Sequence, residues 1–181
     1  MTLKMRREVW NLRARRAMAC ILPALAAVMA RVGMRVVHYS VQHDHIHLIV
    51  ETENATSLSR AVQGLCVRIA RRLNALMGRK GKVFADRFHE RVLASPRQVR
   101  SALRYVLLNA RKHGVASPER RWLDPCSSAS VFDGWSIEVT IGPGVQFALP
   151  TAVPTTWLLR VGWRRGGPLI DPGERPGALT D

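Results

Sequence analysis

Cysteines, acidic side chains and long apolar runs are all scarce in this chain, and each shortage excludes certain classes of protein. The three cysteines, Cys20, Cys66 and Cys126, are odd in number and lack the close pairing of zinc ligands. Neither a disulfide framework nor a cysteine metal site is therefore expected. Cys20 and Cys66 lie in apolar helical patterns and are predicted to be reduced core residues. Reduced thiols favour a cytoplasmic protein.

The longest nearly apolar stretch, residues 17–30, is too short to span a bilayer. It follows basic residues, as the core of a signal peptide does, but Pro23 interrupts it and no small-residue cleavage site follows. A cleaved signal peptide is therefore not expected. Because the first strand is predicted at residues 2–5, very close to Met1, a natural start upstream of Met1 is also considered.

The shortage of acidic residues leaves a formal net charge of +15. Residues 1–121 hold 24 Lys and Arg against 7 Asp and Glu, whereas residues 122–181 hold 4 against 6. A solvated basic surface accounts for a modest excess, but one this large indicates a polyanionic partner, most commonly nucleic acid. Arg greatly outnumbers Lys, and a guanidinium suits bidentate binding of phosphate.

Hydrophobic periodicity predicts short strands interleaved with helices in the first two thirds of the chain. Strands are expected at residues 2–5, 35–42, 43–50 and 87–93, and helices at 15–32, 57–77 and 97–113, the second helix being capped by Thr56 or Ser57. In the strand at 35–42, Val37, Tyr39 and Val41 are predicted to face the core. Residues 1–117 are expected to form one domain. Residues 118–181, rich in Pro, Gly, Ser and Trp, are expected to form an irregular extension with a loose tail and a short helix at 155–164.

The stretch at residues 43–50, His-Asp-His-Ile-His-Leu-Ile-Val, carries the most distinctive chemistry. As a strand, its alternation places His43, His45 and His47 on one face and the apolar residues on the other. Two imidazoles so placed can chelate one divalent metal ion, because neutral imidazole is a common ligand. A half-buried strand with solvated histidines fits the same pattern, so the motif alone leaves both interpretations open.

The helix predicted at 97–113 carries a second candidate group. Its apolar stripe comprises Val99, Ala102, Leu103, Val106, Leu107 and Ala110. Tyr105 and Asn109 are four residues apart and therefore stack on one side of the helix, at the edge of that stripe. A phenol and an amide there can complete a site begun by two histidines. Alternatively, Tyr105 only covers the rim of the core, with its hydroxyl in water.

Taken together, these stretches resemble the single-tyrosine HUH (His-hydrophobe-His) transposases, which include the insertion-sequence-200-like enzymes. The resemblance is carried by the residues at 37–50 with the histidine pair, by Gly-Lys-Val-Phe-Ala-Asp-Arg-Phe at 81–88, and by Tyr-Val-Leu-Leu-Asn-Ala-Arg at 105–111. It extends over about residues 2–115 and is strongest for the REP-associated tyrosine transposases, where REP denotes repetitive extragenic palindromes. It implies an α+β, ferredoxin-like fold, an antiparallel sheet with helices on one face.

The resemblance also implies a chemistry. It makes His45 and His47 metal ligands, Asn109 the third ligand and Tyr105 the nucleophile, with Mg²⁺ or Mn²⁺ as the cofactor. The substrate implied is a single-stranded DNA hairpin, which is cleaved and rejoined through a covalent 5′-phosphotyrosine. Tyr39, on the apolar side of its strand, is not expected to act as a nucleophile.

One departure from the family pattern concerns the residues before the histidine pair. Relatives often have Asn immediately before the first histidine and Pro before that, where this chain has Asp44 and His43. Asp44 is expected to alter the affinity for metal, and His43 offers a competing ligand. The choice of metal is therefore open.

Basic side chains on the second helix, in the loop after it and near Tyr105 are candidate contacts for the DNA backbone, with a solvated helix face as the alternative. They are Arg60, Arg68, Arg71, Arg72, Arg79, Lys80, Lys82, Arg87, Arg91, Arg104, Arg111 and Lys112. The resemblance implies a prokaryotic, nucleoid-associated protein with no membrane partner. It leaves open whether the protein is a monomer or a homodimer.

Two other functions are considered. One is a decayed or domesticated relative that binds single-stranded nucleic acid without cleaving it, which would shift DNA on a gel and form no adduct. The other is a metal hydrolase in which His43, His45 and His47 act on water, which would not need Tyr105.

Overall fold

The computed structural model describes residues 1–29, 33–115, 117–141 and 149–177. Within these ranges the main sheet has three antiparallel strands, β1 (Thr2–Lys4), β2 (Arg35–Val41) and β3 (His45–Glu51). Their order is β1–β3–β2, so the histidine strand β3 lies in the centre. Part of the region predicted as helix at 15–32, and part of the extension, lie outside the described residues.

A further extended segment borders β1 at the edge of the sheet. Thr2 pairs with His89, and Met5 with Phe84, through isolated antiparallel bridges. The prediction of a strand at 87–93 was therefore wrong, because this segment makes only isolated bridges and forms no strand in the described part of the chain. The order of this segment, β1, β3 and β2 agrees with the ferredoxin-like α+β arrangement, and an α+β fold is confirmed.

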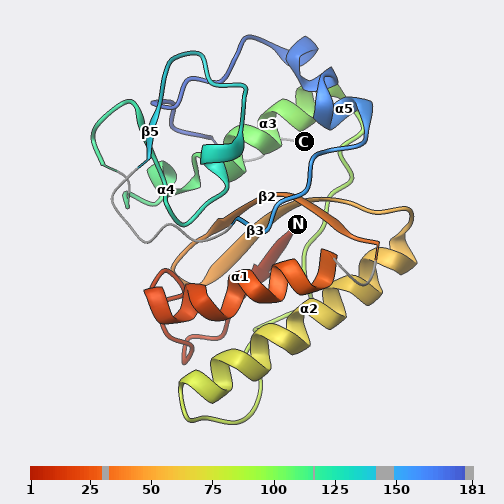
Figure 1. The fold of residues 1–181 in the computed structure, drawn as a ribbon, viewed down its shortest axis with the longest axis vertical. Helices are drawn as coiled ribbons and strands as arrows, with labels where there is room; N and C mark the ends of the chain where they lie inside the picture. Colours follow the sequence, from red (N-terminus) through yellow and green to blue (C-terminus); the bar gives the residue numbers. More distant parts are fainter. Residues whose placement is uncertain (30–32, 116, 142–148, 178–181) are drawn as a thin grey trace.

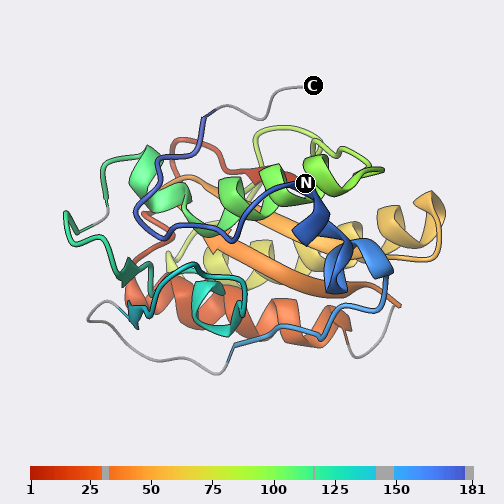
Figure 2. The ribbon, with the colours of Figure 1, turned by 90° about the horizontal axis from the view of Figure 1, so that it is seen from above.

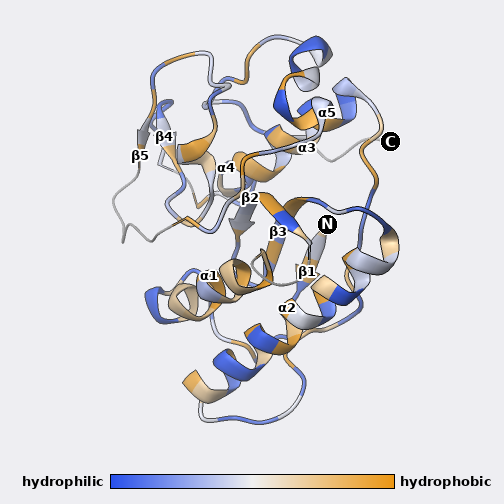
Figure 3. Ribbon diagram, turned by 45° about the vertical axis from the view of Figure 1, so that its right-hand side comes forward, coloured by the Kyte–Doolittle hydropathy of each residue, from blue (hydrophilic) through white to orange (hydrophobic). Residues whose placement is uncertain are grey.

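Helices α1 (Arg15–Met29) and α2 (Ala55–Leu76) cover one face of the sheet (Figure 1). The helix α2 begins earlier than predicted because Asn54, and not Thr56 or Ser57, caps it, its side chain accepting a hydrogen bond from the backbone of Ser57. Its apolar side chains Ala61, Val62, Leu65, Ile69 and Leu73 are buried in the core on this face. In Figure 3 the strands are largely apolar, whereas α2 alternates between apolar and hydrophilic residues.

Helices α3 (Pro96–Leu107) and α4 (Asn109–Lys112) lie on the opposite face of the sheet (Figure 1). Ser95 caps α3, and Pro96 occupies its first turn, where proline is well tolerated. The single helix predicted at 97–113 is interrupted at Leu108, which has φ −105° and ψ 16°. The predicted apolar stripe of this helix is buried as expected.

A β-bulge in β2 changes which side chains face each core. Val36 pairs with Val50 and His38 with Ile49, so Val37 is the additional residue. Val37 packs in the core beneath α3, whereas Tyr39 packs in the core beneath α1 and α2. The prediction that Val37 and Tyr39 share a face was therefore wrong, because the extra residue breaks the alternation.

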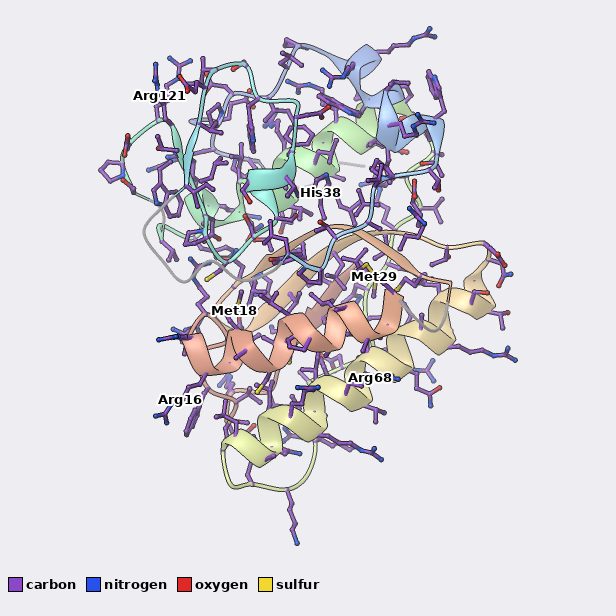
Figure 4. The ribbon with its side chains drawn as sticks, in the orientation of Figure 1. Arg16, Met18, Met29, His38, Arg68 and Arg121 are labelled. Atoms are coloured by element: carbon purple, nitrogen blue, oxygen red, sulfur yellow. The ribbon has the colours of Figure 1, made fainter. Side chains whose placement is uncertain are left out.

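The C-terminal extension covers the face of β2 that points away from α1 and α2. His38 and Ser40 are buried, and the His38 side chain lies beneath the turn that carries η1 (Ala129–Val131) (Figure 4). Ser128 holds this contact, because its hydroxyl lies 3.1 Å from His38 Nδ1 and accepts a hydrogen bond from the backbone of Tyr39.

The rest of the described extension wraps around α3. A short parallel pair joins β4 (Trp122–Leu123) to β5 (Thr140–Ile141). The helix predicted at 155–164 is divided into α5 (Trp157–Arg160) and η2 (Gly162–Gly166), which lie beside α3 (Figure 2). Among the helices in the described ranges, none has both the length and the apolar composition that crossing a membrane requires.

Candidate active site on the histidine strand

His45 and His47 lie on the face of β3 that α3 covers. The strand begins at His45, and alternation brings both rings to the same side, with their centroids 4.6 Å apart. His43 does not join them. It is exposed in the hairpin turn, which closes with a hydrogen bond from the backbone of Gln42 to that of His45. The prediction that all three histidines share a face was wrong, because His43 lies in the hairpin turn and the strand begins only at His45.

Each of the two histidines has a partner at Nδ1. Asp44 Oδ1 lies 2.7 Å from Nδ1 of His45, and Thr2 Oγ1 lies 2.9 Å from Nδ1 of His47. The second contact follows from strand register, because β1 places Thr2 directly opposite His47. With Nδ1 engaged, Nε2 of each ring is the nitrogen available to a metal ion, and such partners fix the orientation of metal-ligating histidines.

Tyr105 approaches the His47 ring from α3, and Asn109 follows it along the chain at the start of α4. The Tyr105 ring lies edge-on to the His47 ring at a centroid distance of 5.0 Å. Asn109 is fully buried at the start of α4, and its amide nitrogen donates a hydrogen bond to the carbonyl oxygen of Tyr105 at 3.2 Å. That contact uses the amide nitrogen, so the amide oxygen Oδ1 of Asn109 takes no part in it.

Two buried polar atoms in the site are unsatisfied. Within the part of the chain that the structure describes, neither Nε2 of His47 nor Oδ1 of Asn109 has a hydrogen-bond partner. Buried polar atoms without partners are rare in folded proteins and call for an explanation. One imidazole nitrogen and one amide oxygen are both metal-ligating atoms, so these residues fit a divalent cation.

The electrostatics of the site keep His47 uncharged. Burial, and then the positive charges of His45, the chain terminus, His113 and Lys112, lower the pKa of His47 to about 3. Burial, followed by His45 and Lys112, also lowers the pKa of His113. A metal ion binds the neutral form of imidazole, so His47 is in its ligating form at neutral pH.

The site has two further neighbours, of which Lys112 was expected near Tyr105 from the sequence and His113 was not expected at the site. The His113 ring lies 5.3 Å from that of His45, and Lys112 Nζ lies 3.4 Å from the hydroxyl oxygen of Tyr105. His113 is four residues beyond Asn109, so helical spacing was a usable signal. Among the described residues, no group of three or more His, Cys, Asp or Glu side chains is arranged to hold a metal ion. The candidate ligand set here therefore depends on the Asn109 amide.

The basic residues proposed from the sequence fall into different environments. Arg60 and Arg87 line a groove of about 730 Å³ between α2 and the edge segment, which Phe84 and Phe88 also line. In contrast, Arg104 pairs with Glu174 at 2.9 Å, and Arg111 donates to the main-chain carbonyls of residues 117, 119, 120, 122 and 172. Arg71, Arg72, Lys80, Lys82 and Lys112 are exposed, while Arg68, Arg79 and Arg91 are half-buried.

The second tyrosine of the chain is in the core. Tyr39 is completely buried beneath α1 and α2, and burial raises the pKa of its hydroxyl. A group that is buried and holds its proton this firmly is a poor nucleophile. Tyr105 is thus the tyrosine that lies beside the histidine pair.

Comparison with protein-family models gives a match over the first part of the chain. A family model described as "Transposase IS200 like" matches residues 1–106, a segment that includes His45, His47 and Tyr105 and ends before Asn109. No curated protein and no solved structure matches the chain significantly. Because the matched segment covers more than half of the sequence, the chain belongs to the family of IS200-like transposases.

Proposed function

We propose that this transposase cleaves and rejoins single-stranded DNA through a covalent bond between Tyr105 and a 5′-phosphate. One observation carries the proposal: within a single chain, the Tyr105 ring lies against His47, beside the unsatisfied buried atoms of His47 and Asn109. A nucleophile next to a set of metal-ligating atoms suits phosphoryl transfer. The DNA partner agrees with membership of a transposase family.

His45, His47 and Asn109 are the residues that would hold a divalent cation, Mg²⁺ or Mn²⁺. Two imidazoles and one amide oxygen suit Mn²⁺ better than Mg²⁺, which prefers oxygen ligands. When bound, the cation would polarise the scissile phosphate and offset its charge. The chain contributes orientation, because Asp44 and Thr2 hold the two imidazoles through Nδ1.

The proposed reaction exchanges one phosphate ester for another. The phenolic oxygen of Tyr105 forms a bond to phosphorus, the bond from phosphorus to the 3′ oxygen breaks, and a free 3′-OH is released. The 5′-phosphotyrosine retains a reactive ester, so a 3′-OH can later displace the tyrosine and rejoin the strand without ATP. A water-activating hydrolase, in contrast, would lose the ester to water.

The exposed arginines and lysines of α2 and of the following loop are the proposed contacts for the DNA backbone. They are Arg60, Arg71, Arg72, Lys80, Lys82 and Arg87. Arg104 and Arg111 are less suited to this role than the sequence indicated, because their guanidinium groups bind the extension. The substrate we propose is a hairpin with a single-stranded flank, as in the REP-associated branch.

The test is a covalent-adduct assay. The protein is incubated with Mn²⁺ and a 3′-labelled hairpin oligonucleotide carrying a single-stranded 5′ flank, and the products are separated on a denaturing gel. We expect a slowly migrating protein–DNA band that protease removes. The variant Tyr105→Phe should form no such band and should still shift the same DNA on a native gel.

The other outcomes assign the other functions. A native gel shift without any adduct from the unmodified protein indicates a non-catalytic nucleic-acid-binding protein. A free 5′-phosphate product that persists in Tyr105→Phe indicates metal-assisted hydrolysis. Either result contradicts the proposed tyrosine chemistry.

A further inference from the structure

The ammonium group of Lys112 contacts the candidate nucleophile directly. Its Nζ lies 3.4 Å from the hydroxyl oxygen of Tyr105 and 4.6 Å from the centroid of the same ring. The first distance allows a long hydrogen bond, and the second is within the range of a cation–π interaction. One cation thus contacts both the ring and the reacting oxygen.

The local backbone explains how Lys112 reaches Tyr105. The two residues are seven positions apart, which is close to two helical turns, so they lie on the same side. Helical side chains lean toward the N-terminus, which directs the long lysine side chain back over the preceding turn. The interruption at Leu108, where α3 ends and α4 begins, lies between Tyr105 and Lys112. Lys112 is the last residue of α4.

The neighbouring arginines on the same helical segment have other roles. Arg104 is paired with Glu174, and Arg111 binds main-chain carbonyls of the extension. Lys112 is exposed, and in the described part of the chain its contacts are those with Tyr105. It is therefore the basic residue of this segment that is placed to act on the phenolic oxygen.

We propose that Lys112 is a catalytic residue that donates a hydrogen bond to the phenolic oxygen of Tyr105 and offsets the negative charge on it during the reaction. This inference rests on the function proposed above. In cleavage, the phenol proton passes to water, the oxygen–phosphorus bond forms, and the departing 3′ oxygen takes a proton from water. Lys112 remains an ammonium throughout and is not consumed.

The same contact acts in the reverse direction. During rejoining, a 3′-OH attacks the phosphotyrosine and loses its proton to water, and the tyrosine oxygen departs with the electron pair of its bond to phosphorus. Lys112 stabilises that departing oxygen until it takes a proton from water. A donor aimed at an oxygen that becomes charged in the transition state lowers the barrier in both directions.

A lysine that only contacts DNA phosphate would behave differently. A phosphate contact stabilises bound DNA equally before and during the reaction, so its loss weakens affinity and leaves the rate at saturating DNA unchanged. A contact with the nucleophilic oxygen acts on the chemical step, so its loss slows the reaction even when all the protein is bound.

The experiment compares Lys112→Met and Lys112→Arg with the unmodified protein. Adduct formation with the hairpin oligonucleotide is followed under single-turnover conditions with saturating protein and Mn²⁺, and the dissociation constant for the same DNA is measured by fluorescence anisotropy. For Lys112→Met we expect the adduct rate constant to fall by about 100-fold, as for loss of one oxyanion donor. The dissociation constant should rise by less than about fivefold, and Lys112→Arg should recover part of the rate.

The matched control is Arg97→Met, which removes one positive charge from the exposed surface of α3, at its opposite end from Tyr105. It should leave the adduct rate constant unchanged. Lys112 is also exposed, so its substitution should alter the free energy of unfolding by less than about 0.5 kcal/mol. Thermal unfolding of each variant checks that a slower reaction does not reflect misfolding.

The outcomes separate this inference from the function on which it rests. An unchanged adduct rate constant in Lys112→Met, with or without weaker binding, overturns the catalytic role and leaves the tyrosine chemistry intact. If the unmodified protein forms no adduct at all, both proposals fail together. A rate that falls in Lys112→Met and recovers in Lys112→Arg supports the catalytic role.

Discussion

At the scale of single residues, two buried histidines are expected to make the free energy of unfolding depend on pH. His38 lies under the extension and His47 lies in the candidate site, and both are less than a tenth exposed. Burial lowers the pKa of His38 to about 4, and burial followed by nearby positive charges lowers that of His47 to about 3. Between about pH 4 and pH 6.5, both histidines are therefore neutral in the folded protein, whereas the same side chains bind protons in the unfolded chain.

We predict that the free energy of unfolding decreases as the pH falls below about 6.5. Between that value and about 4, the unfolded chain binds more protons than the folded protein, so stability rises with pH in this window. Each of these histidines contributes a slope of up to about 1.4 kcal/mol per pH unit. Urea unfolding of the metal-free protein at pH 7, 6 and 5 measures this slope.

The control for that prediction is His38→Asn, which removes one of the two titrating groups. The variant should lose about half of the slope that the pair contributes. A slope identical to that of the unmodified protein would show that His38 does not titrate as its burial indicates.

We predict that Asn109→Ala weakens Mn²⁺ binding by at least about tenfold and that Asp44→Asn weakens it by about tenfold. The first change removes the proposed amide ligand, and the second removes the negative charge that orients His45, an effect typical of such partners. Isothermal titration calorimetry of the DNA-free protein provides the measurement. His43→Asn is the control, since His43 lies in the turn; equal affinity in all three variants would contradict the ligand set.

At the scale of elements, the extension holds the tyrosine helix α3 against the sheet. Trp163 of η2 is almost completely buried in the core beneath α3. Glu51 at the end of β3 accepts four hydrogen bonds from the backbones and hydroxyls of Thr155 and Thr156. These contacts place α3, and with it Tyr105, between two layers of the same chain.

We predict that Trp163→Ala lowers the free energy of unfolding by about 3–5 kcal/mol, because it leaves a large cavity against α3. Denaturant unfolding measures the loss. Trp157→Ala should cost clearly less, since half of the Trp157 side chain is exposed. Equal losses from the two substitutions would indicate that η2 is not a main support of α3.

At the scale of the whole molecule, positive charge is divided unevenly along the chain. Residues 1–121 carry 24 Lys and Arg against 7 Asp and Glu, whereas residues 122–181 carry a small acidic excess. The extension therefore contributes packing and main-chain acceptors more than charge. The basic surface that we propose for DNA binding lies on α2, on the loop after it and on the sheet edge.

We predict that binding of the hairpin oligonucleotide weakens steeply with salt, because each phosphate contact releases counterions. Replacing Arg71 and Arg72 with Gln should reduce the slope of log affinity against log salt concentration by about 1.4, or about 0.7 per contact. Anisotropy titrations between 50 and 300 mM NaCl, about the range in which such slopes are measured, provide the readout. Arg160→Gln in α5 should leave the slope unchanged; a matching decrease there would contradict the proposed DNA surface.

Local periodicity was sufficient to predict much of the candidate site from the sequence. The spacing of His45 and His47 defined a shared strand face, and the spacing of Tyr105 and Asn109 defined a shared helix side. The apolar stripe of α3 followed from the same reasoning. Backbone geometry alone determines which neighbouring residues share a face, so these features required no knowledge of distant contacts.

Only the tertiary structure decided how distant segments meet. Strand pairing placed Thr2 against His47, the bulge moved Val37 to the other core, and the extension buried His38 and engaged Arg104 and Arg111. Each of these depends on the register or packing of residues far apart along the chain, which local periodicity does not encode. The sequence by itself therefore determined which groups are candidates for the chemistry, and the fold decided their partners.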